Sequence, residues 1–192
     1  MHSERELLNR DLYVFETMVS QLGTYLSSED TFWELQEPGM PKLTIGGCLM
    51  RRDRLQTLHG KLTPPAAEQL QQIVGQLGAV MMENVVRFEQ RAHQELHARF
   101  GEWVRCLGKL SQHVAEDAGY YADKVDIRVV IGALVDQMQH TPFQLAPQIL
   151  TELHTLDNNL RNRWQPDGFV WVATWQAAYP RDGFWYLYGL PR

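Results

Sequence analysis

The stretch TPPAAEQLQQIVGQLGAVMMENVVRFEQRAHQELHARFGEWVRCLGKLSQHV, residues 63–114, decides the fold that this sequence predicts. Thr63 can cap the free amides of a first helical turn, and Pro64 suits the first helical position. Apolar residues then recur every three or four positions, which is the period of one helix face. This stripe consists of Leu70, Val74, Leu77, Met81, Val85, Phe88, Ala92, Leu96, Phe100, Trp103, Leu107, Leu110 and Val114. The stretch therefore predicts one long helix over about residues 64–117.

Such a helix is longer than a compact domain. At 1.5 Å per residue it would extend roughly 80 Å, whereas a compact chain of 192 residues has a diameter of about 40 Å. Glycine inside a helix costs about 1 kcal/mol, so we expect any bend or break at Gly101 or Gly108. An unbroken helix would instead project and expose its apolar stripe to another helix or to a second copy of the chain.

The opposite face of this helix carries charged residues, several of them four positions apart and of opposite sign. They are Glu83, Arg87, Arg91, Glu95, Glu102 and Arg105. Pairs of this kind stabilise the exposed side of a helix. We therefore expect this face to be solvated.

The densest group of titratable residues is FEQRAHQELHARF in the same helix. Glu89, His93 and His97 are each four residues apart and form one stripe, which is a candidate metal site. The spacing matches neither H-E-x-x-H nor the E-x-x-H of di-iron bundles. Glu89 also projects onto the apolar side, where His93 is one turn away. A structural pair at the edge of the core is the alternative interpretation.

Four other segments predict helices. Over residues 4–27, apolar residues recur at alternating spacings of four and three, as in the seam of a coiled coil. This seam consists of Leu8, Leu12, Phe15, Val19, Leu22 and Leu26. Shorter helical patterns cover residues 48–59, 120–139 and 145–164. Within residues 120–139, a VVI run makes a strand the alternative interpretation.

Two segments predict strands. Residues 31–47 contain a Pro-Gly-Met-Pro turn between short aromatic and β-branched runs, and indicate a strand, a turn and a strand. Within residues 168–189, FVWVATWQ alternates with a period of two, YPRDG supplies a turn, and FWYLY completes what we interpret as a β-hairpin. A lone hairpin is marginally stable in water, so we expect the two segments to meet as a small antiparallel sheet. The predicted fold is a mainly helical α+β bundle around the long helix, in a single domain over residues 1–192.

The predicted C-terminal hairpin is rich in aromatic side chains and is a candidate binding surface. Trp171 and Trp175 fall on one strand, and Trp185 and Tyr186 on the other. Exposed aromatic rings can stack on a sugar or base, or anchor a partner protein. Packing of these rings against the helices is the alternative interpretation.

Composition excludes several classes of protein. The net charge of −5 disfavours nucleic-acid binding, and only Arg51, Arg52 and Arg54 form a basic cluster, for which a solvated helix face is the simpler interpretation. No apolar stretch reaches the roughly 20 residues of a membrane helix. The N-terminus lacks the features of a signal peptide, so we expect a cytoplasmic protein. Cys48 and Cys106 lie in apolar surroundings and are expected to be buried thiols.

These patterns favour a non-enzymatic helical interaction or scaffold protein that associates with itself, as a dimer, or with a partner protein. We expect no cofactor, no nucleic acid and no membrane. A G-x-S-x-G elbow and a Walker motif are both absent from the sequence.

Asp123 and Asp126 could hold a divalent cation, but acidic residues near a helix start explain them more simply. The alternative function is a metal-dependent or small-molecule enzyme centred on Glu89, His93 and His97.

Overall fold

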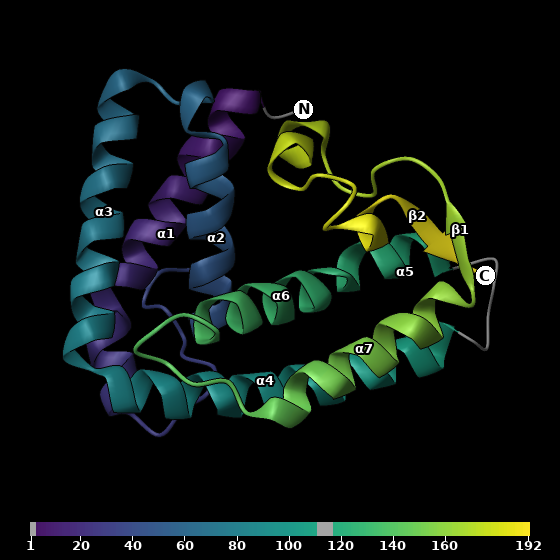
Figure 1. Ribbon diagram of the computed structural model, residues 1–192. Helices are drawn as coiled ribbons and strands as arrows, with labels where there is room; N and C mark the ends of the chain where they lie inside the picture. Colours follow the sequence, from purple (N-terminus) through teal and green to yellow (C-terminus); the bar gives the residue numbers. More distant parts are fainter. Residues whose placement is uncertain (1–2, 111–116) are drawn as a thin grey trace. The chain divides into compact units, whose positions relative to one another are not determined.

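The computed structural model describes residues 3–110 and 117–192 and has a mainly helical α+β fold with a small two-stranded antiparallel sheet (Figure 1). This confirms the predicted fold class. The chain divides into two compact units, residues 1–95 and 96–192, and the boundary falls inside helix α4. The single domain expected over residues 1–192 stays a prediction. No helix in the described ranges combines the length and hydropathy needed to cross a membrane.

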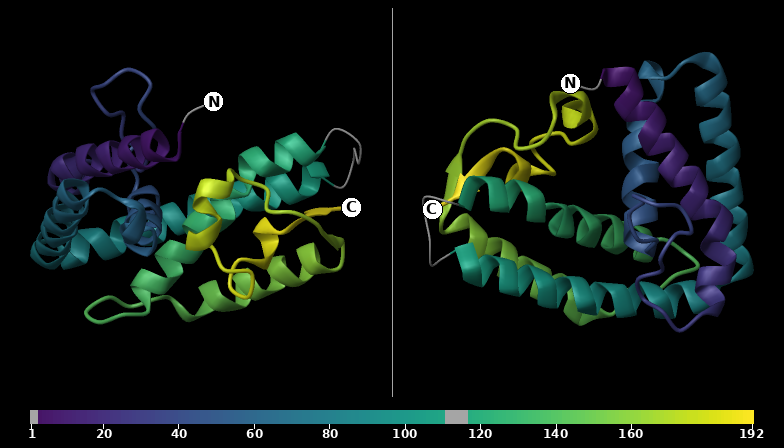
Figure 2. Two further views of the ribbon diagram at one scale, coloured as in Figure 1. Left: turned by 90° about the horizontal axis from the view of Figure 1, so that it is seen from above. Right: turned by 180° about the vertical axis from the view of Figure 1, so that it is seen from behind.

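The first unit is built around α1 (Glu4–Ser27), which packs against α2 (Ile45–Thr57) and α3 (Pro64–Glu83) (Figures 1 and 2). A 3-10 turn, η1 (His59–Lys61), precedes α3. The whole apolar seam predicted in residues 4–27 is buried. The seam is therefore covered by helix packing inside this unit.

The long helix predicted over residues 64–117 is two helices, α3 and α4 (Val85–Leu110). The break lies at Asn84, whereas Gly101 and Gly108 both lie inside α4. The Asn84 side-chain amide donates to the carbonyl of Val80 at 2.9 Å. A side chain that bonds to its own helix competes with the regular backbone pattern, which explains why asparagine ends the helix here. The far end of the predicted helix, residues 111–116, lies outside the described residues.

The second unit holds the C-terminal part of α4, then α5 (Asp117–Lys124), α6 (Asp126–Met138) and α7 (Pro147–Arg161). The segment predicted over residues 120–139 is helical but broken at Val125, and its VVI run lies in α6, so the strand alternative is wrong. Arg128 joins α6 to α7 through two hydrogen bonds to Asp157, of 2.8 and 2.7 Å. Its guanidinium also stacks 4.5 Å from the ring centre of Tyr186.

The predicted strand pair in residues 31–47 is wrong. One isolated antiparallel bridge, between Trp33 and Leu43, is the only β pairing of this segment. Thr44 then caps α2 by accepting a hydrogen bond from the amide of Gly47 at 2.9 Å. Gly46 and Gly47, at the end of the predicted second strand, therefore lie in the first turn of α2, where the Thr44 side chain satisfies the amide of Gly47.

The predicted C-terminal hairpin is also wrong, and the sheet has other strands. β1 (Trp164–Pro166) pairs with β2 (Gly189–Pro191), while the segment between them forms the 3-10 helices η2 (Ala173–Ala178) and η3 (Trp185–Leu187). The rings of Trp171 and Trp175, four residues apart, meet edge to face at 5.9 Å. Trp171 also meets the ring of Tyr179 at 5.2 Å, and such aromatic pairs add to the stability gained from burial.

Candidate functional site

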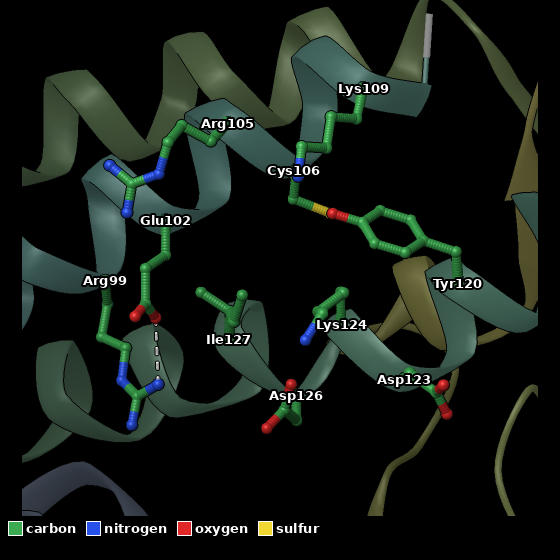
Figure 3. Close-up of a pocket in the computed structure, with 10 residues that line it drawn as sticks. All are labelled: Arg99, Glu102, Arg105, Cys106, Lys109, Tyr120, Asp123, Lys124, Asp126 and Ile127. Carbon is green, nitrogen blue, oxygen red and sulfur yellow. Dashed lines mark hydrogen bonds and ion pairs between the residues drawn. The ribbon is translucent and has the colours of Figure 1, made fainter. Parts of the chain in front are cut away.

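The second unit contains a polar pocket of roughly 320 Å³ between α4, α5 and α6 (Figure 3). This volume is at the lower end of the range for small-molecule sites, about 300–1,000 Å³. One wall comes from α4, and the other comes from α5 and the first turn of α6. The lining residues are Arg99, Glu102, Arg105, Cys106, Lys109, Tyr120, Asp123, Lys124, Asp126 and Ile127.

The α4 wall is mainly cationic. Arg99 donates to Glu102 at 3.1 Å, and this pair occupies one end of the pocket (Figure 3). Arg105 and Lys109 are four residues apart on the same helix and are exposed. Within the part of the chain that the structure describes, neither makes an ion pair, and the same holds for Lys124 on the opposite wall. These three cations are therefore available to an anionic group.

The opposite wall presents carboxylates where α5 passes into α6. Asp123 is exposed near the end of α5, and Asp126 is half-buried in the first turn of α6. Burial raises the pKa of Asp126, an effect that Arg99, the backbone amide of Ile127 and Lys124 oppose. The charged form of Asp126 is thus incompletely solvated, which is the condition under which a nearby cation is most stabilising.

The Cys106 thiol of α4 meets the Tyr120 hydroxyl of α5 on one side of the pocket (Figure 3). The Cys106 thiol is buried, and burial raises its pKa to about 11, although a hydrogen bond with Tyr120 and the charges of Lys124 and Lys109 oppose this shift. A thiol with this pKa is protonated at neutral pH and is a poor nucleophile. Cys106 therefore contributes a neutral surface to the pocket.

The candidate metal stripe is spread along α4. Glu89 and His93 are half-buried and His97 is exposed, and His93 Nδ1 lies 3.0 Å from the backbone oxygen of Glu89. Among residues 3–110 and 117–192, no three His, Cys, Asp or Glu side chains gather in a way that could hold a metal ion. The stripe stays a prediction from the sequence, and the candidate site is not built on it.

The sequence predicted that the charged face of α4 is solvated, and this prediction is wrong for two of its residues. Arg91 is buried and donates to the backbone oxygens of Ser28 and Glu29, where α1 ends. Glu95 is fully buried and accepts a hydrogen bond from the amide of Gly46, where α2 begins. The expectation is wrong here because helix ends leave unpaired carbonyls and amides, and charged side chains from a neighbouring helix can satisfy them.

The basic cluster of α2 is also directed inward. Arg54 is buried and forms two hydrogen bonds with Asp11, of 2.7 and 2.5 Å, and Arg51 lies 3.4 Å from the same carboxylate. Arg52 pairs with its neighbour Asp53. The solvated helix face expected for these arginines is therefore wrong for Arg54, which is a structural partner of α1.

The four aromatic candidates divide into one buried and three half-buried residues. Tyr186 is buried, so it is a core residue. Trp185 is half-buried and lies under the guanidinium of Arg161, 3.9 Å from its ring centre. Trp171 donates to the backbone oxygen of Ala122 at 3.0 Å and contacts Trp175. A role of these rings in partner binding stays a prediction.

Comparison with known proteins gives no further guide to the site. No known protein family, curated protein or solved structure matched this chain. The sequence had marked Asp123 and Asp126 as an acidic pair, but Lys109, Lys124 and Tyr120 carried no signal of their own. Their shared position depends on how α4, α5 and α6 pack, and this is not visible in helical periodicity.

Proposed function

We propose that this chain is a non-enzymatic interaction protein that binds a small charged ligand in the pocket between α4, α5 and α6. The observation that carries the proposal is the separation of charge across the pocket. Arg105 and Lys109 lie on one wall and Asp126 on the other, and no ion pair within the described residues joins them. Opposite charges that are held apart around a hollow can each be satisfied by a ligand that fills it.

The helical origin of the walls supports this proposal. Arg105 and Lys109 are spaced by one turn of α4, and Asp126 is placed by the first turn of α6. Groups on helices are held more accurately than groups on loops, so less ordering is required when a ligand binds. The Arg99–Glu102 ion pair at one end of the pocket is held by α4 as well.

Nuclear magnetic resonance of the full chain tests this function. Acetate, methylammonium, glycine and inorganic phosphate are added separately to ¹⁵N-labelled protein at constant ionic strength. We expect at least one probe to give saturable shifts that concentrate on the lining residues. Shifts from acetate, glycine or phosphate should weaken in the R105Q/K109Q variant but not in R10Q. Arg10 is exposed and does not line this pocket. The absence of any saturable, pocket-centred shift with all four probes would remove the proposal.

Self-association is a second candidate function. Fewer exposed apolar residues support it in the structure than the sequence predicted. The seam of α1 is buried, and the long helix ends at Asn84. Two large apolar side chains remain exposed on either side of this break, Met82 at 60% and Val86 at 67%. A second copy of the chain could cover these two side chains, and their burial would stabilise the contact. Light scattering over a range of concentrations tests it, and a monomer throughout would remove it.

A further inference from the structure

We propose that the ligand of this pocket is a free α-amino acid with an uncharged side chain, whose carboxylate binds to Arg105 and Lys109 and whose ammonium group binds to Asp126. This inference rests on the proposed function and names the class of ligand for the same pocket. It follows from the sign of the charges on each wall, from their balance and from the neutral residues of the lining.

The α4 wall fits a carboxylate. Arg105 presents a planar guanidinium, which can bind both oxygens of a carboxylate, and Lys109 adds an ammonium one turn further along the same helix. Figure 3 shows that this wall faces α5 and the start of α6 across the hollow. A carboxylate at this wall leaves the remainder of the ligand directed toward Asp126.

The opposite wall fits an ammonium group. Asp126 is half-buried, and its carboxylate lacks part of the solvation that it would have in water. The charged groups that act on it are Arg99 and Glu102 from α4 and Lys124 from α5. No ion pair in the described ranges of the chain involves Asp126. Arg99 and Lys124 act on Asp126 without forming such a pair, and a ligand ammonium would supply a directly bonded positive partner.

The balance of charge disfavours a polyanion. The pocket is lined by four cations and three carboxylates, so the positive excess is small. A phosphate group near Arg105 and Lys109 would gain from these cations but would be repelled by Asp123 and Asp126. A simple cation would meet the reverse problem. A zwitterion places one charge of the appropriate sign at each wall and adds no net charge.

Three of the lining residues are neutral. Ile127 contributes an apolar surface, and Cys106 and Tyr120 contribute weakly polar groups. The volume of roughly 320 Å³ is small for a drug-sized ligand but is suitable for a metabolite. An uncharged ligand side chain would contact this part of the wall without adding a charge that requires a partner.

Calorimetry on the unmodified full chain tests the class of ligand. Each of the common L-α-amino acids is titrated, and each one that binds is compared with its N-acetyl derivative and its carboxamide. We expect at least one binder with an uncharged side chain, and a loss of about tenfold or more in affinity for both derivatives, since each lacks one charge-assisted contact. Equal binding of either derivative, or the lack of any amino-acid binder, would overturn the inference.

Two variants assign each charge to its wall. In D126N, the free amino acid and its N-acetyl derivative should bind with similar affinity, while the carboxamide remains weaker. In R105Q/K109Q, the free amino acid and its carboxamide should become similar. The matched controls D182N and R10Q change exposed residues that do not line the pocket and should retain both preferences. Comparison of the derivatives on the unmodified protein needs no variant, so a variant that fails to fold does not remove the test.

The outcomes separate this inference from the proposed function. If acetate or phosphate shifts the pocket resonances while no amino acid binds, the pocket is a charged-ligand site and only the amino-acid assignment fails. If none of the probes gives a pocket-centred shift and no amino acid binds, both proposals fail.

Discussion

The buried carboxylate of Glu95 accepts a hydrogen bond from the backbone amide of Gly46 at 2.9 Å. The two residues are 49 positions apart in the chain. Gly46 lies in the first turn of α2, where backbone amides have no partner within their own helix. A side chain of α4 therefore contributes to the N-terminal cap of α2, and the positive end of the α2 dipole stabilises its charge.

We expect Glu95→Ala to lower the free energy of unfolding by about 1–3 kcal/mol, because it leaves a buried amide without this acceptor. Glu95→Gln keeps an acceptor oxygen and should cost less. Urea unfolding followed by circular dichroism measures both, with Glu83→Ala as an exposed control on α3. A Glu95→Ala variant as stable as this control would contradict the role of the hydrogen bond.

Asp11 and Arg54 form a second buried link, between α1 and α2. Removing one partner of such a pair leaves a buried charge uncompensated, so Asp11→Ala should cost about 3–5 kcal/mol. The exposed pair between Lys61 and Glu4 is the control, and Glu4→Ala should cost at most about 1 kcal/mol. The double variant Asp11→Leu/Arg54→Met should be more stable than Asp11→Ala. With the single variants Asp11→Leu and Arg54→Met the double variant completes a cycle, and strict additivity of these two changes would argue against coupling.

Gly189 is expected to tolerate no side chain. A Cβ atom there would lie 2.3 Å from the backbone oxygen of Gln165, on the paired strand β1, and 2.8 Å from the ring of Trp164. Gly189→Ala should therefore destabilise the protein by about 2–3 kcal/mol through overpacking. Gly183→Ala is the matched control, because no atom lies within 4 Å of its added Cβ. Thermal unfolding compares the two, and equal melting temperatures would contradict this packing.

Asp126 should make the stability of the protein depend on pH. Burial raises its pKa above the usual 3.8, so the folded state favours the protonated form. The protonated carboxyl of Asp126 therefore contributes to the stability of the folded state. This stabilisation is present in full below pH 3.8 and is lost as pH rises through the higher pKa of Asp126 in the folded state. The stability of Asp126→Asn relative to the unmodified protein should therefore increase between about pH 4 and pH 7. Urea unfolding at several pH values measures it, and a constant difference would contradict the shift.

The two thiols should react slowly with alkylating reagents. Burial raises the pKa of Cys48 to about 12 and that of Cys106 to about 11. Since the thiolate is the reactive form, labelling of the folded protein at pH 7 should be far slower than in urea, and it should accelerate as pH rises. The variants Cys48→Ser and Cys106→Ser separate the two sites by mass spectrometry. Rapid labelling of either thiol in the folded state would contradict its burial.

The helices could be predicted from the sequence because their signals are local. The periodic apolar residues of α1, α3 and α7, and the Pro64 start of α3, lie within a few turns of one another. An apolar face with a period of 3.6 residues must be buried whatever covers it. The burial of Cys48 and Cys106 follows from the same apolar surroundings and is confirmed.

The candidate site was less predictable. The sequence shows Asp123 and Asp126 as neighbouring acidic residues and Arg105 as part of a charged helix face. Nothing in the sequence placed them around one pocket, because the pocket requires that α4 meet the junction of α5 and α6. Lys109 and Lys124 are surface lysines by pattern, and only their position relative to Asp126 makes them candidates for binding.

The sequence alone thus determined the main helical segments and their apolar faces, although not the start of α2 or the break at Asn84. The tertiary structure decided what satisfies the remaining polar groups. Glu95 reaches Gly46, Arg91 reaches the end of α1, and Trp164 pairs with Pro191. Each of these contacts joins residues far apart in the chain, and its energy depends on burial and on the geometry of two polar groups. Helical periodicity shows which faces of a helix are apolar, but it does not show which distant group satisfies a buried polar atom.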